Sequence, residues 1–416
     1  MHDARFRLPC KGPEGSDSRG QSSDTADGVT SIRTLYLLSA AVMVAMIGLG
    51  IIWPLIPVYA RELGATGFQL GLIIASFPLA RTLFNSPIGR FSDLRGRKPL
   101  LLIGLLAYAA VSLLYVWASR VEALLVVRFL QGLASVLVVP IAMALAGDIA
   151  PRDRLGLYMG TLNMAVMLGL GVGPMLGGAI RDAFGMNAAF YAMGALTLIT
   201  YVGVKVFIPD DPDRGAREKG RHVVPFRVLL THRVLRGLLL LRFFNAGGYG
   251  CVYTFLPLLA LSLHLTSSQV GLILGANILL SAFLQRWFGA LSDRVDPVRQ
   301  IVWGALLAGL PILAMPLAEG FWGLLALNVL MGLGGGVAMP AGLTLSARIG
   351  RTMGMGAVIG LLETSFGLGM IASPILSGIV MDLAGLPSIF IIGGSLVVLG
   401  TALMFLYLRG YEEGSL

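Results

Sequence analysis

Charged residues are scarce in this chain of 416 residues: they make up 13% of it, where an ordinary soluble domain carries about 25%. Hydrophobic residues make up 56%. Uncharged apolar stretches of about 18 residues or more recur along the chain, and each is long enough to cross a hydrocarbon core of roughly 30 Å. The scarcity of charge excludes a soluble fold and predicts a polytopic α-helical membrane protein.

Cysteine and histidine are also scarce. Cys10 and Cys251 stand far apart and the four histidines are scattered, so neither a disulfide framework nor a metal site is expected. The chain lacks the G-x-x-x-x-G-K-[ST] motif, which excludes ATP hydrolysis by a P-loop. Its apolar segments hold no cluster of acid, histidine and serine residues. Neither an enzyme nor a bound cofactor is therefore expected.

Polar and apolar stretches divide the chain into five parts. Residues 1–32 are rich in Gly, Ser, Asp and Arg and predict a disordered cytoplasmic tail. Residues 33–208 and 233–409 each hold six apolar segments, which predict six spanning helices in each. Residues 209–232 are crowded with charge and predict a cytoplasmic linker, and residues 410–416 predict a second short tail.

Basic residues are distributed unevenly among the loops. Placing both termini in the cytoplasm puts 25 Lys and Arg residues on the cytoplasmic side, three outside and three within helices, as the positive-inside rule requires. The net charge of +9 thus belongs to short loops, and nucleic acid is not expected as a partner. The lipid bilayer is the expected environment, in a bacterial cytoplasmic membrane. Nothing in the chain requires a second subunit, so a monomer is expected.

The two sets of apolar segments are related by a repeat at an offset of 200 residues. The repeat aligns these pairs: Pro57 and Pro257, Asp93 and Asp293, Pro140 and Pro340, Gly169 and Gly369, Pro174 and Pro374, Asp182 and Asp382. Chance matches in apolar sequence would align leucines rather than prolines and aspartates. Parallel six-helix repeats with the substrate site between them are the architecture of one large class of secondary transporters. We therefore expect an all-α membrane protein with twelve spanning helices in two pseudo-symmetric halves.

A charged motif follows the second predicted helix, at residues 89–101. It resembles the G-x-L-[SA]-D-R-x-G-R-[KR] signature of the major facilitator superfamily, and the matching residues include Gly89, Asp93, Gly96, Arg97 and Lys98. The resemblance implies that the loop latches a gate between the halves, whereas the positive-inside rule alone explains the basic residues but not the aspartate. The second half keeps a shortened copy that contains Asp293.

The fifth predicted helix matches G-x8-G-x3-G-P-x2-G-G without a gap. The matching residues are Gly160, Gly169, Gly173, Pro174, Gly177 and Gly178. The pattern resembles the antiporter motif of the drug-proton antiporters within the same superfamily, as does the run Pro54, Pro57 and Tyr59 that ends the first helix. Generic packing of small residues is the alternative interpretation. The resemblance implies export by proton antiport, with the helix at an interface that rocks between states.

Proton coupling requires a titratable group inside the membrane, and Glu363 is the only carboxylate in the middle of a predicted span. The first helix has no acid, although many drug-proton antiporters keep one there. In the superfamily the second helix contacts the eleventh, which implies that Arg81 pairs with Glu363. We rank Arg242 below Arg81 as the partner, because it is shallow enough to extend to the headgroups.

Arg128 begins a run similar to the R-x-x-Q-G motif of the superfamily. The resemblance gives it a role in proton coupling. The alternative is that its long side chain extends to the outer headgroups.

Aromatic and polar residues at membrane depth are candidates for binding a substrate. The asparagines there more often join helices than bind ligands, and the aromatic residues either face a central cavity or form an interfacial belt. The candidates are Trp53, Asn163, Arg242, Asn245, Tyr249, Tyr253 and Asn277. The expected function is export of small hydrophobic or amphipathic molecules by proton antiport. A metabolite or sugar facilitator or symporter, or a lipid flippase, stays open as an alternative on the same fold.

Overall fold

The computed structural model describes residues 20–151, 154–208, 226–292 and 294–409. Regular structure in these residues is helical throughout. The first half consists of α1 (Gly20–Ile52), α2 (Leu55–Glu62), α3 (Gly67–Arg95), α4 (Arg97–Trp117), α5 (Val121–Val136), α6 (Val139–Ile149), α7 (Leu155–Phe184) and α8 (Met186–Phe207). The second half consists of α9 (Phe226–Thr231), α10 (Arg233–Ser262), α11 (Ser267–Ser292), α12 (Pro297–Ala314), a 3₁₀ turn (Met315–Leu317), α13 (Phe321–Met353), α14 (Met355–Ala384) and α15 (Leu386–Leu408).

The predicted all-α membrane fold is confirmed. Eleven stretches of the described residues are long and apolar enough to cross a membrane. α10 is equally long but less apolar, because Arg242, Asn245 and two tyrosines interrupt its apolar sequence. It is the twelfth long segment of the two-times-six arrangement.

Two details differ from the sequence-based boundaries. α1 is helical from Gly20 onward, where the sequence predicted a tail up to residue 32, and the short helix α9 lies at the end of the predicted linker. Residues 1–19, 209–225 and 410–416, which hold the rest of the predicted tails and linker, lie outside the described residues.

The first predicted span is broken into α1 and α2 at Trp53 and Pro54. Proline lacks the backbone N–H that would continue the hydrogen-bond ladder, so a break at this position is expected. In the second half Thr254 stands where the repeat would place Pro54, and α10 runs unbroken through this position. The break therefore gives the first half a bend that the second half lacks.

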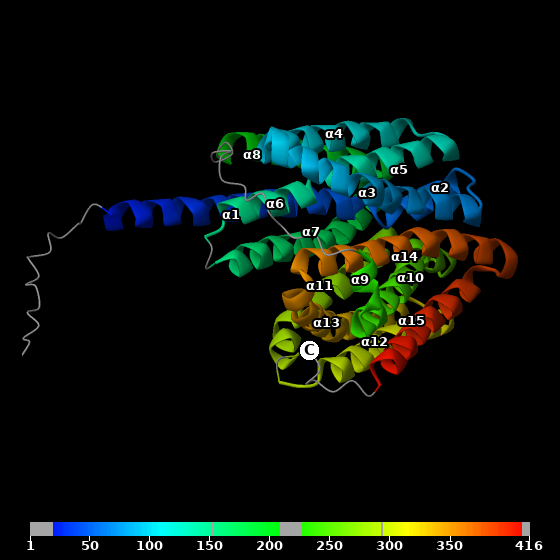
Figure 1. Cartoon of the computed structure of the whole chain (residues 1–416). Helices are drawn as coiled ribbons and strands as arrows, with labels where there is room; N and C mark the ends of the chain where they lie inside the picture. The colour runs from blue at the N-terminus through cyan, green and yellow to red at the C-terminus, as the bar shows by residue number, and fades with distance from the viewer. Residues whose placement is uncertain (1–19, 152–153, 209–225, 293, 410–416) are drawn as a thin grey trace, which may run out of the picture.

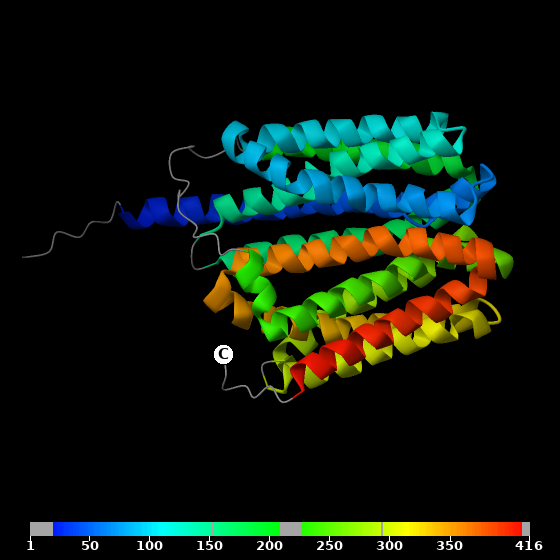
Figure 2. The same cartoon turned by 45° about the vertical axis from the view of Figure 1, so that its right-hand side comes forward.

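The halves lie side by side as two layers of helices, with α1–α8 in one and α9–α15 in the other (Figures 1 and 2). α1 begins and α15 ends at the same end of the molecule, which we call the terminal end. At the opposite end, which we call the closed end, α7 packs against α11, α3 packs against α14, and α2 meets α10.

Glycine permits the close contact between the halves at the closed end. A Cβ atom built on Gly178 would lie 2.1 Å from the carbonyl oxygen of Ser267, and one built on Gly378 would lie 2.0 Å from that of Gly67. Any side chain at either position would therefore push α7 from α11 or α14 from α3. Small residues allow such close backbone approach between membrane helices.

Two aspartates fasten this contact in a pseudo-symmetric way. Asp182 of α7 accepts hydrogen bonds from the backbone N–H groups of Ser267 (3.1 Å) and Ser268 (2.7 Å) at the start of α11. Asp382, its repeat equivalent in α14, accepts from the N–H groups of Gly67 (2.7 Å) and Phe68 (2.9 Å) at the start of α3. Each carboxylate thus satisfies unpaired donors at a helix N-terminus of the other half.

We expect Asp182→Ala and Asp382→Ala each to loosen the closed end. Loss of a helix cap costs about 1 kcal/mol, so a cysteine placed at Val270, which is 5% exposed behind this contact, should be alkylated roughly five-fold faster in each variant. Asp182→Ala should have the larger effect, because Asp182 also accepts from the hydroxyl of Ser268 (2.6 Å). Unchanged labelling in the double variant would contradict a fastening role.

Candidate functional site

A cavity of about 330 Å³ lies between the halves. Its walls come mainly from α10, α11, α13 and α14, and the first half contributes Trp53, Met167 and Leu170. Apolar and methionine side chains predominate, with a few polar groups among them. The volume and composition are those of a site for a small organic molecule.

Six of the predicted substrate-binding candidates line this cavity, namely Trp53, Arg242, Asn245, Tyr249, Tyr253 and Asn277, as does Glu363. Asn163 is not among the lining residues. The aromatic residues among them therefore line the cavity and do not form an interfacial belt, which is the alternative interpretation. Four of the six stand on α10 at spacings of three, four and four residues, which places them on one face of that helix.

The polar centre of the cavity is an ion pair between Arg242 of α10 and Glu363 of α14. Nη2 of Arg242 donates to Oε1 of Glu363 at 2.7 Å, and the side chains are 28% and 61% exposed. The guanidinium also lies over the ring of Phe366, 5.1 Å from its centroid. Solvent-sized molecules can therefore reach the carboxylate while its charge is balanced.

The predicted pairing of Arg81 with Glu363 is wrong in this structure, since Arg242 takes that place. The helices of Arg81 and Glu363 do pack together, as the resemblance implied, but Arg81 lies over the ring of Phe77 at 5.8 Å. Its charge still interacts with that of Glu363. Residues at the same depth pair only if their helices are neighbours, and α10 packs against α14 within one half, which the sequence does not show.

Arg242, Asn245, Tyr249 and Tyr253 form a polar stripe along one face of α10, and a chain of hydrogen bonds holds Tyr253 at the closed-end side of this stripe. The hydroxyl of Tyr253 donates to Oδ1 of Asn277 (3.3 Å), and Nδ2 of Asn277 donates to the backbone oxygen of Asn328 (2.7 Å). Trp53, which the repeat aligns with Tyr253, contacts it with ring centroids 5.1 Å apart. The two halves thus meet ring against ring at equivalent positions.

Arg128 does not reach the headgroups, because only 3% of it is exposed. Its Nη1 donates to Oε1 of Gln131 (2.6 Å), which also accepts from the hydroxyl of Tyr115 (2.6 Å), and Nε2 of Gln131 donates to the hydroxyl of Tyr108 (3.1 Å). The guanidinium lies 4.8 Å from the ring centroid of Phe77. Arg128 therefore belongs to a buried polar network in the first half and does not line the cavity.

The glycines of the fifth-helix motif contact two different helices. Gly169, Gly173 and Gly177 lie against α1, where built Cβ atoms would come within 2.6 Å of its atoms, and Gly178 lies against α11. Gly160, nearer the terminal end, has no neighbouring atom within 4 Å of a built Cβ. Pro174 adds to the second contact, because its carbonyl oxygen is 2.1 Å from a Cβ built on Gly271.

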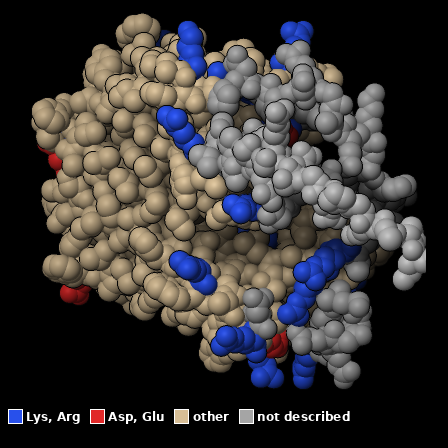
Figure 3. Space-filling view, turned by 90° about the vertical axis from the view of Figure 1, so that its left-hand side faces the viewer, with Lys and Arg blue, Asp and Glu red and all other residues tan. Residues whose placement is uncertain are grey.

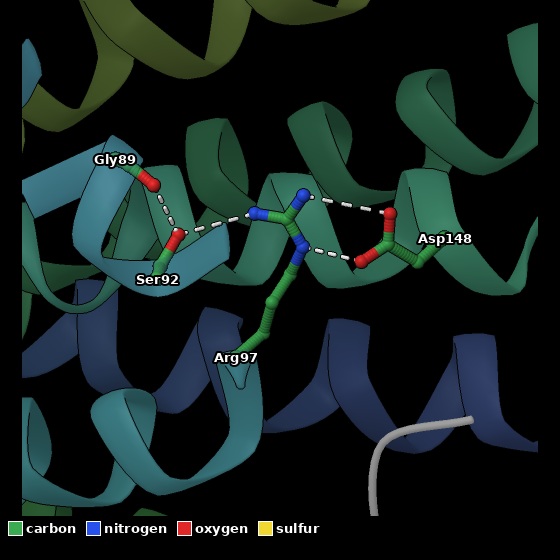
Figure 4. A network of polar contacts seen from close by, with 4 residues as sticks. All are labelled: Gly89, Ser92, Arg97 and Asp148. Atoms are coloured by element: carbon green, nitrogen blue, oxygen red, sulfur yellow. Dashed lines mark hydrogen bonds and ion pairs between the residues drawn. The ribbon is translucent and has the colours of Figure 1, made fainter. Parts of the chain in front are cut away.

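The charged motif, which covers the end of α3 and the start of α4, forms a network at the terminal end (Figure 4). Arg97 makes an ion pair with Asp148, at the end of α6, and donates to the hydroxyl of Ser92 (3.2 Å). That hydroxyl donates to the backbone oxygen of Gly89 (2.7 Å). Gly96 ends α3 with φ of 97°, a conformation that favours glycine. Sequence reasoning missed Asp148, because the motif's spacing carries no information on α6.

The structure describes some of the other predicted members of the motif and not others. Lys98 is buried, and Gly89 has no neighbour within 4 Å of a built Cβ, so Gly89 does not serve close packing in this conformation. The side chain of Asp93 and the whole of Asp293 lie outside the described residues. In the second half Ser292 keeps the equivalent bond to the oxygen of Gly289 (2.7 Å).

We expect Arg97 and Asp148 to be energetically coupled. Arg97→Gln and Asp148→Asn should each destabilise the folded protein, and the double variant should lose less than the sum, with a coupling energy of roughly 0.5 to 3 kcal/mol for contacting residues. Unfolding in mixed micelles with increasing SDS measures each free energy. Strict additivity would contradict the pair.

The terminal end carries many Lys and Arg side chains and few Asp and Glu side chains in the part that is described (Figure 3). Among the described residues, no group of three or more His, Cys, Asp or Glu side chains is placed to hold a metal ion. The groups that line the cavity are suited to ion pairing, hydrogen bonding and contact with aromatic rings.

Comparisons with known proteins agree with this architecture. The family model of the Major Facilitator Superfamily matches residues 38–258 and 238–415. An uncharacterized MFS-type transporter of Methanocaldococcus jannaschii is 30% identical over 362 residues, which is 86% of this chain and 94% of that protein. The quinolone resistance protein NorA of Staphylococcus aureus is 22% identical over 359 residues, covering 84% of this chain and 90% of that protein.

Solved structures show the same fold. A bacterial homolog of the human lysosomal transporter Spinster, in an inward-facing and unoccupied conformation, superimposes with a TM-score of 0.78 at 17% identity, covering 91% of this chain and 97% of that one. The nucleoside transporter NupG superimposes with a TM-score of 0.77 at 12% identity, covering 91% of this chain and 100% of that one.

Proposed function

Because the chain belongs to the Major Facilitator Superfamily of membrane transporters, we propose that it exports small hydrophobic or amphipathic molecules in exchange for protons. The observation that carries this proposal is the Arg242–Glu363 ion pair, which lies inside a largely apolar cavity between the halves. An accessible carboxylate at membrane depth is the group that proton coupling requires.

Protonation of Glu363 is the coupling step. Two positively charged groups bear on it, Arg242 on α10 and Arg81 on α3, and Tyr249 of α10 lines the same cavity. A proton removes the negative charge, so the ion pair is lost and Arg242 is released within the cavity. The released charge of Arg242 then faces the cavity between the halves, and the free energy difference between the two conformations changes because the first half lies at a different distance from this charge in each of them.

Alternating access in this protein means opening the closed end. The contacts of α7 with α11 and of α3 with α14, which we place on the outside of the membrane, separate while the terminal end closes. The basic terminal end then faces the cytoplasm, as the positive-inside rule favours. In this arrangement the cavity takes up its substrate from the cytoplasmic side.

Two further observations favour export of drug-like molecules. The fifth-helix motif resembles that of drug-proton antiporters, and its glycines form both the α1 contact and the contact with the other half. The Staphylococcus aureus relative is named for quinolone resistance. The cavity walls, rich in aromatic and methionine side chains, suit ligands of varied shape.

The test uses the full-length protein in liposomes with an imposed pH gradient and no membrane potential. Uptake of ethidium, chloramphenicol and glucose is followed beside protein-free liposomes. Accumulation of either drug against its concentration gradient, with counterflow of protons, supports the proposal. Equilibration of glucose without proton movement would replace it by a sugar facilitator.

A further inference from the structure

The side chains at the two ends of the polar stripe on α10 have bonding partners, whereas a side-chain atom in its middle has none. Arg242 is paired with Glu363 at one end, and Tyr253 is bonded to Asn277 at the other. Between them, the buried Oδ1 of Asn245 has no hydrogen-bond partner, and Tyr249 carries a hydroxyl on the same helix face. Both residues line the cavity.

An unpaired polar atom in a largely apolar cavity carries a free energy cost unless a ligand or water pairs with it. The Asn245 side chain carries an amide that both donates and accepts hydrogen bonds, and Tyr249, one turn further along the same face, carries a hydroxyl. The rings of Trp53, Tyr253 and Phe366 also line the cavity. These positions match a molecule with an aromatic ring and an adjacent group that both donates and accepts hydrogen bonds.

The charges of the cavity argue for an uncharged ligand. Glu363 already has its charge balanced by Arg242, and the nearby charge of Arg81 is positive, so a cation would be repelled or would have to displace Arg242. An anion would have to take Arg242 from Glu363 and leave the carboxylate unpaired. A neutral ligand requires neither exchange, and a charge without its partner is costly at membrane depth.

We propose that the cavity binds an electrically neutral aromatic molecule with a hydroxyl or amide group, held by Asn245 and Tyr249. This inference rests on the proposed proton antiport and names its substrate class. It also explains the exchange: when a proton neutralises Glu363, the released Arg242, three residues from Asn245 on the same helix face, donates to Oδ1 of Asn245 and displaces the ligand.

Exchange of one proton for a neutral molecule moves one positive charge per cycle. A membrane potential must therefore drive transport even without a pH gradient, and a potential of about 59 mV changes the equilibrium distribution about ten-fold for one charge. Exchange of one proton for a singly charged cation moves no net charge and does not respond to the potential. The substrate's charge can thus be read from the driving force.

The experiment imposes an interior-positive potassium diffusion potential at equal pH on liposomes that contain the full-length protein. Radiolabelled chloramphenicol, a neutral aromatic molecule with amide and hydroxyl groups, is expected to accumulate inside, and the cation ethidium is not. Accumulation of ethidium under a pH gradient, with no response of chloramphenicol to either gradient, would overturn this inference and leave proton antiport standing. Transport of no probe under either gradient would overturn both.

Two variants test the named residues. Tyr249→Phe and Asn245→Leu should each raise the KM for chloramphenicol about 2- to 10-fold, the loss expected for one hydrogen bond. Asn245→Leu should in addition weaken the inhibition of substrate binding by protons, which a merely structural role would not change. Tyr191→Phe, at an exposed position on α8, is the matched control. An unchanged KM in both variants would overturn the assignment.

Discussion

Glu363→Gln should abolish accumulation driven by a pH gradient while substrate still equilibrates across the membrane. Glutamine has nearly the shape of the protonated acid but cannot release a proton, so the two conformations lose their dependence on pH. Coupling between two ligands is typically about 5- to 150-fold in affinity, and this factor should fall to one. The measurement is substrate affinity at acid and alkaline pH, together with accumulation in liposomes.

Two controls make this result specific to the ion pair. Glu319→Gln removes an exposed carboxylate from the closed end and should leave coupling intact. Glu363→Asp keeps a titratable group but shortens the reach to Arg242, so it should retain coupling at reduced rate. Full accumulation by Glu363→Gln would show that another group carries the proton.

Gly178→Ala should shift the protein toward the conformation in which α7 and α11 have separated at the closed end. Its Cβ would lie 2.1 Å from the oxygen of Ser267 and 2.5 Å from the carbonyl carbon, both of which belong to backbone and cannot rotate away. Overpacking of this kind costs about 1–3 kcal/mol. The cost falls only on the conformation in which α7 touches α11. The population of the other conformation, in which the helices have separated at this end, should therefore rise roughly 5- to 150-fold.

Spin labels at Ser119 and Glu319, in loops of the two halves at the closed end, would report this shift as longer label distances by pulsed EPR. Gly160→Ala is the matched control, because it adds the same methyl group to the same helix and motif where no atom lies within 4 Å. Identical distance distributions in Gly178→Ala and the parent protein would contradict a contact that depends on glycine.

The sequence alone was sufficient for the architecture. The scarcity of charge marks the spans, and the pairs Asp182 with Asp382 and Pro174 with Pro374 mark two related halves. These are properties of single segments and their order, which local hydropathy and an internal repeat record directly. Asn245, Tyr249 and Tyr253 could likewise be named as cavity candidates, because polar residues at membrane depth rarely face lipid.

Only the tertiary structure decided which charges meet. Arg81, Arg128 and Arg242 all stand inside spans, and nothing in the sequence separates the one that pairs with Glu363 from the one buried against Gln131. That choice depends on which helix faces neighbour each other, and hence on the rotation of each helix about its axis. The same holds for Asp148, which Arg97 reaches across the fold. Composition and periodicity determine that helices span the membrane, whereas packing between them determines which side chains pair.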